Sequence, residues 1–285
     1  MIPHMNIVAW SNIAPWASFR QVEQDLIISR AVIEIFNDDY LREELRFRGG
    51  TALNKLHFPT PLRYSEDIDL VRTTKGPIKE VICRLRETLE PWLGEAEYES
   101  SKVAPKLLFR VPAEEEGQLR LKVEIVTFET EAFDEPLTIK HAADNPWFTG
   151  EAEIPTYSRE EMLATKLRAL LQREQGRDLF DLARALSIFN GLDLDRIVEL
   201  LARYLNLQGQ SISRAQAEQR MFGKLAQAGF LADVRPLLSA EQADGLTEKS
   251  KNASFVSVFD QLVSCIPGEP WKRTNEMKER FGLVT

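Results

Sequence analysis

The sequence contains little cysteine and little histidine. Among 285 residues there are two cysteines, Cys83 and Cys265, and three histidines, at positions 4, 57 and 141. The histidines are scattered and do not have the spacing of a zinc site. Both cysteines lie in apolar patterns typical of helices, so we expect them to be reduced, buried packing residues. This cysteine usage favours a cytoplasmic protein.

Long apolar segments are also missing. No run approaches the roughly 20 residues that a membrane-spanning helix needs. The N-terminal stretch MIPHMNIVAWSNIAPW has neither the basic start nor the long apolar core of a signal peptide. We therefore expect a cytoplasmic location and no membrane partner.

Acidic residues outnumber basic ones. The sequence has 44 Asp and Glu against 36 Lys and Arg, which gives a formal net charge of -8. This balance argues against a large non-specific DNA-binding protein, so we expect no DNA partner. It is compatible with a local basic groove beside an acidic metal site. With 44% hydrophobic residues, the chain is long enough for one large domain or two moderate ones.

The first half of the chain alternates between helical and strand patterns. Amphipathic spacing predicts a helix over residues 18–41, and a proline opens another over residues 77–93. Period-two alternation predicts strands over residues 106–111 and 119–128, and residues 67–71 form a further candidate strand. This order predicts a mixed α/β domain.

The second half has helical spacing almost throughout. Ser158 and Glu161 match a capping box at the start of the first of these helices. We place the domain boundary at Pro155. The expected organisation is an α/β (α+β) domain with a mixed sheet over residues 1–155, followed by an α-helical bundle over residues 156–285.

Two aspartates in the strand candidate DIDLV point to a metal site. Side chains two residues apart on a strand lie on the same face, about 7 Å apart, so Asp67 and Asp69 project together. Two such carboxylates repel each other unless one takes up a proton or a cation holds both. Mg²⁺ suits one or two carboxylates combined with water and phosphate oxygens. The pair is therefore predicted to bind a divalent cation.

A glycine pair lies shortly before these aspartates. Gly49 and Gly50 lack a Cβ, so their backbone N–H groups can approach a ligand closely. A helix that starts at Thr51 would present free N–H groups to a phosphate, and the Thr51 hydroxyl can add a donor. A phosphate cradle beside a metal-binding carboxylate pair is suited to nucleotide chemistry.

A third carboxylate candidate lies on the strand pattern LRLKVEIVTF. Lys122 and Glu124 share one face of this strand, and the apolar residues share the other. Glu124 is the candidate third metal ligand, and it would also help to remove the proton of an attacking hydroxyl. A surface ion pair near Lys122 is the alternative role for Glu124.

These motifs resemble motif I of the nucleotidyltransferase superfamily that includes DNA polymerase β. The similar elements are Gly49-Gly50-Thr51 and the later Arg63-x-Ser65-x-Asp67-Ile68-Asp69. The longer gap between them, and the segment KLRALLQREQGRDLFDL, are more specifically similar to the AbiEii toxin family. That family comprises MenT-like nucleotidyltransferase toxins of type IV toxin–antitoxin and phage-defence systems. The resemblance covers residues 47–182.

The resemblance assigns roles in the first half of the chain. Asp67 and Asp69 match the metal-binding aspartates of the family. Gly50 and Thr51 match the glycine and hydroxyl residue of the phosphate cradle, and Ser65 matches a serine near the nucleotide phosphates. The third position is usually aspartate in the superfamily, where this sequence has Glu124.

The resemblance also assigns roles in the second half. Lys166 matches an active-site lysine that contacts nucleotide phosphate, and Asp178 matches the acidic residue of a late Arg-Asp motif, with Asp181 one turn later. By helical spacing Lys166 shares a face with Arg173. We expect the helical domain to supply these residues from across the nucleotide cleft. Asp178 and Asp181 are also compatible with plain helix-capping roles.

The arginines allow two interpretations each. Arg63 and Arg173 are candidates either for phosphate contacts or for ion pairs with the acids. The later Arg203, Arg214 and Arg220 fit the surface of helices, with an RNA-binding groove as the alternative.

The resemblance implies a Mg²⁺- or Mn²⁺-dependent enzyme with an NTP as substrate. It would transfer a nucleoside monophosphate to an acceptor hydroxyl, by resemblance the 3′ end of tRNA, and so inhibit translation and growth. A cognate antitoxin would restrain it. The alternatives are transfer to a small molecule such as an aminoglycoside, a kinase-like reaction, and a non-catalytic nucleotide-binding regulator.

Overall fold

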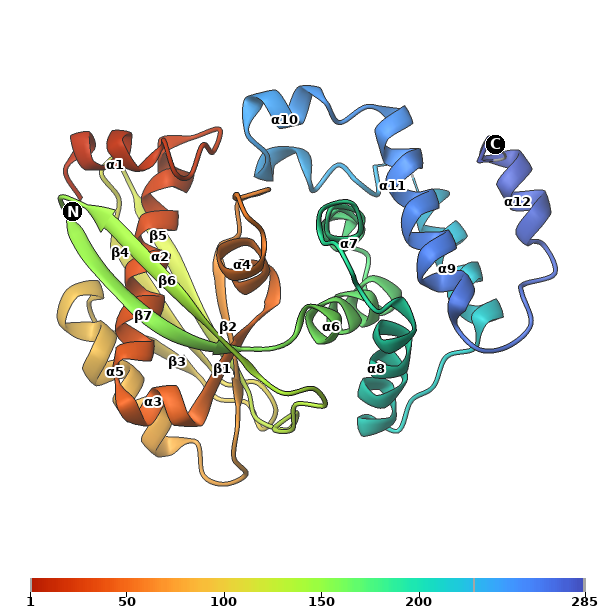
Figure 1. The fold of residues 1–285 in the computed structure, drawn as a ribbon. Helices are drawn as coiled ribbons and strands as arrows, with labels where there is room; N and C mark the ends of the chain where they lie inside the picture. Colours follow the sequence, from red (N-terminus) through yellow and green to blue (C-terminus); the bar gives the residue numbers. More distant parts are fainter. Residues whose placement is uncertain (1, 228, 284–285) are drawn as a thin grey trace. The chain divides into compact units, whose positions relative to one another are not determined.

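A computed structural model describes residues 2–227 and 229–283 (Figure 1). The chain divides into two compact units, of which the first ends at Ser158 and the second begins at Arg159. The sequence pattern places the domain boundary at Pro155, three residues before this division. The first unit is mixed α/β and the second is helical, which confirms the predicted fold class.

A five-stranded mixed sheet forms the centre of the first unit. Its strand order is β1-β2-β5-β4-β3. Strands β2 and β5 run parallel, whereas the other neighbours are antiparallel. The parallel register places Asp67 opposite Lys122 and Asp69 opposite Glu124. The strands are β1 (Leu45–Arg48), β2 (Asp67–Arg72), β3 (Glu97–Glu99), β4 (Lys106–Pro112) and β5 (Gln118–Val126).

Helix α2 (Phe19–Asn37) packs against this sheet. Its N-cap Ser18 accepts a hydrogen bond from the Gln21 backbone, and its apolar side chains are buried. Helix α2 is shorter than the predicted helix over residues 18–41. The Asp38 backbone is extended, and its side chain accepts a hydrogen bond of 2.9 Å from the Leu41 N–H, which starts a new helix.

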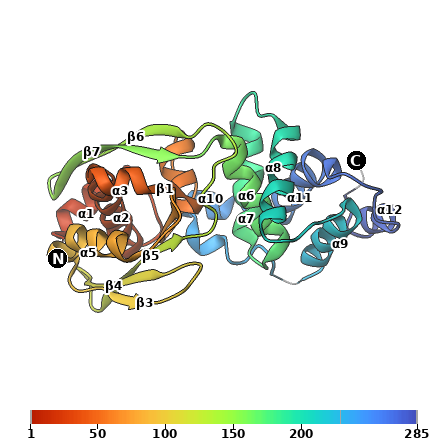
Figure 2. The ribbon, with the colours of Figure 1, turned by 90° about the horizontal axis from the view of Figure 1, so that it is seen from below.

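A hairpin covers the other side of helix α2, as Figure 2 shows. It consists of β6 (Leu137–Asn145) and β7 (Phe148–Thr156), joined by two residues. The sequence patterns above do not predict this hairpin. Its strands alternate between exposed and buried positions only over part of their length, and its turn has no glycine.

The first unit has further short helices and one longer one. Helix α5 contains Cys83, which is exposed, and the second cysteine, Cys265, is also exposed. The expectation that both are buried is therefore wrong. In α5 the buried Val81 lies two positions before Cys83, and two positions turn a helix by about 200°, so Cys83 faces solvent. The elements are α1 (His4–Trp10), α3 (Asp39–Glu44), α4 (Gly49–Ala52), η1 (Leu53–His57) and α5 (Lys79–Leu93).

The second unit is a bundle around helix α6 (Arg159–Gln172), which contacts α7, α8 and α9. The buried Tyr204 hydroxyl donates a 2.7 Å hydrogen bond to Glu161 of α6. Among the described residues of the whole chain, no helix is both long and apolar enough to cross a membrane. The remaining elements are α7 (Gly176–Ile188), α8 (Leu194–Leu207), α9 (Arg214–Leu225), η2 (Arg235–Leu237), α10 (Ala240–Asp244), α11 (Glu248–Gln261), η3 (Val263–Cys265) and α12 (Thr274–Arg280).

Candidate active site

The glycine pair forms the first turn of helix α4, directly after strand β1. Gly49 has a φ of 81°, a conformation that side-chain-bearing residues rarely adopt. A Cβ at Gly49 would clash with Asp69 Oδ2 and lie 2.9 Å from Asp69 Cβ. A Cβ at Gly50 would lie 2.6 Å from Arg63 Nη2 and 3.1 Å from Ser65 Oγ. The two glycines therefore make room for the acid on one side and for the Arg63–Ser65 loop on the other.

Thr51 fixes this turn to the acidic strand. Its side chain is buried, and its hydroxyl donates to the backbone oxygen of Asp67. The Thr51 hydroxyl oxygen also lies 2.8 Å from Ser65 Oγ. In this arrangement the Thr51 hydroxyl holds the cradle, the loop and strand β2 together.

Asp67 and Asp69 lie on one face of strand β2, as the sequence predicts, and both are half-buried. Burial raises the pKa of Asp69 above its ordinary value, and the negative charges of Asp67 and Glu124 raise it further. Lys122 and Arg48 oppose this rise only in part. Ionising Asp69 therefore costs free energy, and a bound cation would offset this cost.

Lys122 lies between the carboxylates of two neighbouring strands. Its Nζ is 3.0 Å from Asp67 Oδ2 and 3.4 Å from Glu124 Oε2. Burial would lower the pKa of Lys122, but Asp67, Asp69 and Glu124 together raise it above its ordinary value. Lys106 lies 3.5 Å from the same Glu124 oxygen. The interpretation of the sequence did not include Lys122 in the site, although its position two residues before Glu124 on one strand face was a signal for it.

The donor set fits a magnesium ion held by two carboxylates. In the described part of the chain, no three His, Cys, Asp or Glu side chains stand together as a ready metal cluster. Mg²⁺ does not require one, because it binds through one or two carboxylates plus water and substrate phosphates. Asp67 and Asp69 meet that requirement, whereas Glu124 Oε2 is engaged by two lysines.

A cavity of about 220 Å³ adjoins the cradle. Thr51, Arg63 and Ser65 contribute to its lining. Arg63 is buried, and its Nη1 donates a 2.9 Å hydrogen bond to the Tyr64 backbone oxygen. On another wall, Lys55 Nζ lies 2.9 Å from Asp25 Oδ1. The predicted phosphate-binding side chains of the first unit are therefore gathered around one cavity and one helical turn.

The second unit contains a buried cluster of opposite charges. Lys166 Nζ lies 3.3 Å from Asp178 Oδ1 and 3.0 Å from Asp181 Oδ2, and both aspartates are fully buried. Arg173 binds Asp178 through two hydrogen bonds, of 2.7 and 2.9 Å. Lys166 and Arg173 thus share one carboxylate, in agreement with the helical face that their spacing predicts.

Charge pairing keeps Asp178 ionised. Burial alone would raise the pKa of Asp178, but Lys166 and the Arg173 hydrogen bonds lower it below its ordinary value. Asp178 lies in the first turn of α7, where the helix dipole also favours a negative charge. The cluster fixes the position of the Lys166 ammonium group, which is almost completely buried.

A family model for the nucleotidyl transferase AbiEii toxin of type IV toxin–antitoxin systems matches residues 31–262. The chain belongs to the AbiEii family. It is therefore an enzyme of the nucleotidyltransferase class, and the match confirms the resemblance of its motifs. A comparison with curated proteins finds no match.

Solved structures share the fold of this AbiEii protein. The nucleotidyltransferase toxin MenT4 of Mycobacterium tuberculosis aligns with a TM-score of 0.59 at 15% identity and covers 97% of this chain and 98% of its own. JHP933 of Helicobacter pylori aligns with a TM-score of 0.56 at 16% identity and covers 94% and 98%. At such low identity these alignments show a shared fold and no more. The shared fold covers nearly the whole of each chain.

Proposed function

We propose that this AbiEii protein transfers a nucleoside monophosphate from an NTP to the 3′ end of tRNA, and so inhibits translation and growth. The contact of Gly49 with Asp69 supports this proposal most strongly. It joins a helical turn that begins with two glycines to a strand with two carboxylates on one face. A triphosphate on that turn would lie beside the metal-binding acids.

The residues of the first unit have distinct roles in this proposal. Gly49 and Gly50 have no Cβ, so a phosphate could approach their backbone N–H groups closely. Arg63 and Ser65 add a cation and a hydroxyl beside Gly50. Asp67 and Asp69 hold Mg²⁺ or Mn²⁺, which when bound neutralises charge on the phosphates and on the departing pyrophosphate.

Glu124 takes the proton of the acceptor. Lys106 and Lys122 lie 3.5 and 3.4 Å from its Oε2, and these contacts hold the carboxylate in place. The acceptor hydroxyl oxygen attacks the α-phosphorus, and its proton passes to this carboxylate. The bond between the α-phosphorus and the oxygen that bridges to the β-phosphate then breaks. Pyrophosphate leaves with the electron pair, and a new phosphate ester remains on the acceptor.

Lys166 and Arg173 are the candidate phosphate-binding residues of the second unit. An ammonium group has three donors, and the contacts with Asp178 and Asp181 use two of them, so one remains for a phosphate oxygen. The two aspartates orient Lys166. Arg173 has a half-exposed side chain, although Asp178 engages its guanidinium.

Transfer from labelled NTP to total RNA tests this function. We expect α-³²P-labelled NTP to label the tRNA band in the presence of Mg²⁺, and γ-³²P-labelled NTP to leave it unlabelled. The Asp67→Ala variant should give no label. A toxin held in check by a cognate antitoxin should also arrest growth when expressed alone, and the Asp67→Ala variant should not.

The same assay separates the alternatives. The first unit has 27 acidic residues against 18 basic ones, which would suit a cationic small-molecule acceptor. Label confined to small molecules would support that acceptor, and transfer of the γ-label would indicate a kinase-like reaction. NTP binding without release of pyrophosphate would indicate a non-catalytic regulator.

A further inference from the structure

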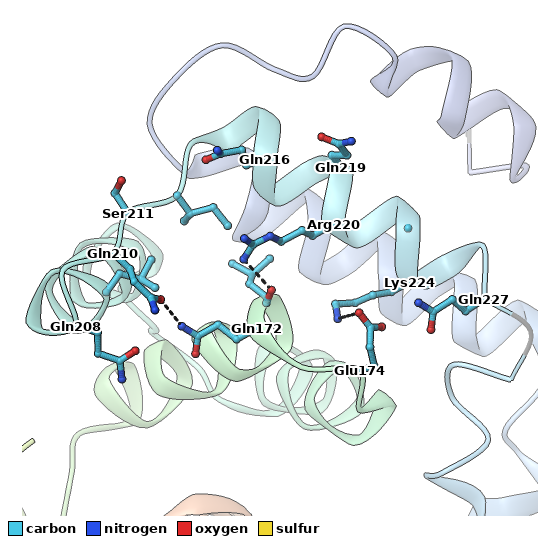
Figure 3. Close-up of a pocket in the computed structure, with 14 residues that line it drawn as sticks. Gln172, Glu174, Gln208, Gln210, Ser211, Gln216, Gln219, Arg220, Lys224 and Gln227 are labelled. Atoms are coloured by element: carbon cyan, nitrogen blue, oxygen red, sulfur yellow. Dashed lines mark hydrogen bonds and ion pairs between the residues drawn. The ribbon is translucent and has the colours of Figure 1, made fainter. Parts of the chain in front are cut away.

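An open groove of about 1120 Å³ lies in the second unit, apart from the charged cluster around Lys166. Figure 3 shows it between the end of helix α6, the connection from α8 to α9, and helix α9. The groove is unusually rich in glutamine. Six of the twelve glutamines in the chain are among its fourteen lining residues, namely Gln172, Gln208, Gln210, Gln216, Gln219 and Gln227.

Folding accounts for only part of this enrichment. Gln219 and Gln227 are exposed and make no side-chain hydrogen bond within the described residues. Gln172 donates a 2.9 Å hydrogen bond to Gln210 across the groove, and Gln216 serves in the capping box at the start of α9. Several amide groups therefore face the groove with unused donors and acceptors.

The groove has a small excess of positive charge. Arg220 is exposed, donates a 3.1 Å hydrogen bond to the Leu171 backbone oxygen, and has no carboxylate partner among the residues that the structure describes. Lys224 Nζ donates to the Arg173 backbone oxygen at 2.6 Å and lies 3.2 Å from Glu174. The second unit as a whole is nearly neutral, with 18 basic and 17 acidic residues. A polyanion therefore meets less repulsion here than on the acidic first unit.

The chemistry of the lining favours RNA. The volume of the groove exceeds the roughly 300–1,000 Å³ of a small-molecule pocket. Glutamine amides pair with base edges, sugars and phosphates, and the 2′-hydroxyl of ribose offers both a donor and an acceptor. None of the residues that line the groove is aromatic, so hydrogen bonds rather than base stacking would hold the strand.

We propose that this glutamine groove binds the acceptor RNA through its ribose hydroxyls, base edges and backbone. The proposal rests on the RNA-directed transfer proposed above and assigns a binding surface to its acceptor. Gln172 follows Lys166 by six residues on the same helix, which is a rise of about 9 Å. The groove therefore begins within two helical turns of Lys166 on the same helix.

Fluorescence anisotropy with the full-length protein tests this groove. The probes are a labelled RNA with the sequence of a tRNA acceptor arm and the DNA of the same sequence, both measured in EDTA without NTP. We expect Arg220→Glu and the double variant Gln219→Ala/Gln227→Ala each to weaken RNA binding at least about tenfold. RNA should bind more tightly than DNA. The exposed Arg235 and the half-buried Gln242 lie in the same unit but outside the groove, so Arg235→Glu and Gln242→Ala are the controls and should bind RNA as the wild type does.

Two outcomes would overturn the groove proposal. The first is RNA affinity that is unchanged in both groove variants, as expected if the groove binds a protein. The second is equal affinity for RNA and DNA. A transfer assay separates this failure from failure of the proposed function, because Asp67→Ala should bind RNA normally and transfer nothing. Groove variants should raise the KM for RNA without lowering kcat. RNA binding without any nucleotidyl transfer would leave the groove intact and refute the function.

Discussion

The Asp69 carboxylate lies directly against the Cα of Gly49, at a distance that leaves no space for a Cβ. The backbone conformation at Gly49 and the position of the Asp69 side chain depend on each other. Gly49 turns the chain from strand β1 into the cradle helix with a positive φ, and Asp69 projects from strand β2 into the space that the missing side chain leaves. Neither the turn nor the acid can change without displacing the other.

Alanine at Gly49 should therefore affect both stability and transfer. Gly49→Ala is expected to lower the free energy of unfolding by about 1–3 kcal/mol, because of its positive φ, and to displace Asp69. Gly94 is the control: its φ is 87°, and nothing lies within 4 Å of a Cβ added there. Gly94→Ala should cost similar stability and keep transfer normal per folded molecule. Denaturant titration and transfer assays of both variants decide this, and normal transfer by Gly49→Ala would contradict the site geometry.

Neutralising Asp69 should stabilise the protein while it stops transfer. Since burial and Asp67 raise the pKa of Asp69, the native state binds this proton at a higher pH than the unfolded state, whose pKa is near 3.8. The free energy of unfolding therefore falls as the pH rises from about 3.8 toward the native pKa of Asp69. Asp69→Asn should increase the free energy of unfolding at pH 7 in EDTA, and this gain should vanish at low pH. Its transfer rate should drop by at least about 10²–10³-fold. An Asp69→Asn variant that is less stable than the wild type at pH 7 would contradict the repulsion between the Asp67 and Asp69 carboxylates.

Removing Lys122 should make the first unit dependent on magnesium. Without its ammonium group, the Asp67 and Glu124 carboxylates lose their shared cation. Lys122→Met is expected to lower the melting temperature by about 2–4 °C in EDTA and to show a larger rise than the wild type when Mg²⁺ is added. Lys140→Met removes an exposed ion pair with Glu151 and serves as the control. Equal Mg²⁺-induced shifts in both variants and the wild type would argue against a cation on these acids.

The buried cluster of the second unit should produce a distinct pH dependence. The pKa of Asp178 is lowered in the native state, so its contribution is fully present above about pH 3.8 and is lost as the pH falls toward the native value. Asp178→Asn should lower the free energy of unfolding at pH 7 by about 3–5 kcal/mol, and the difference should shrink below pH 3.8. The exposed Asp195 supplies the control, since Asp195→Asn should change stability by less than about 0.5 kcal/mol. A pH-independent loss in Asp178→Asn would show that the ion pairs are not its cause.

Much of the site could be predicted because its signals are local in the sequence. The shared face of Asp67 and Asp69 follows from the two-residue period of a strand, and the shared face of Lys166 and Arg173 follows from helical spacing. The glycine pair alone is typical of a loop, and it indicates a phosphate cradle only in combination with the acidic strand that follows. These patterns need no knowledge of distant contacts.

The remaining features depend on contacts between distant segments. The pairing of β2 with β5 sets Lys122 between Asp67 and Glu124, and no pattern within either strand specifies that register. The β6–β7 hairpin lacks the glycine turn that signals such pairs. The glutamine groove brings Gln172 of α6 beside residues about 40 positions later in the chain, which becomes visible only in the folded unit.

A crystal structure of the protein with Mg²⁺ and a non-hydrolysable NTP tests the central claim most directly. The account predicts a metal ion ligated by Asp67 and Asp69, with the triphosphate on the backbone N–H groups at Gly49 and Gly50. A triphosphate bound elsewhere, with no metal on either aspartate, would contradict it.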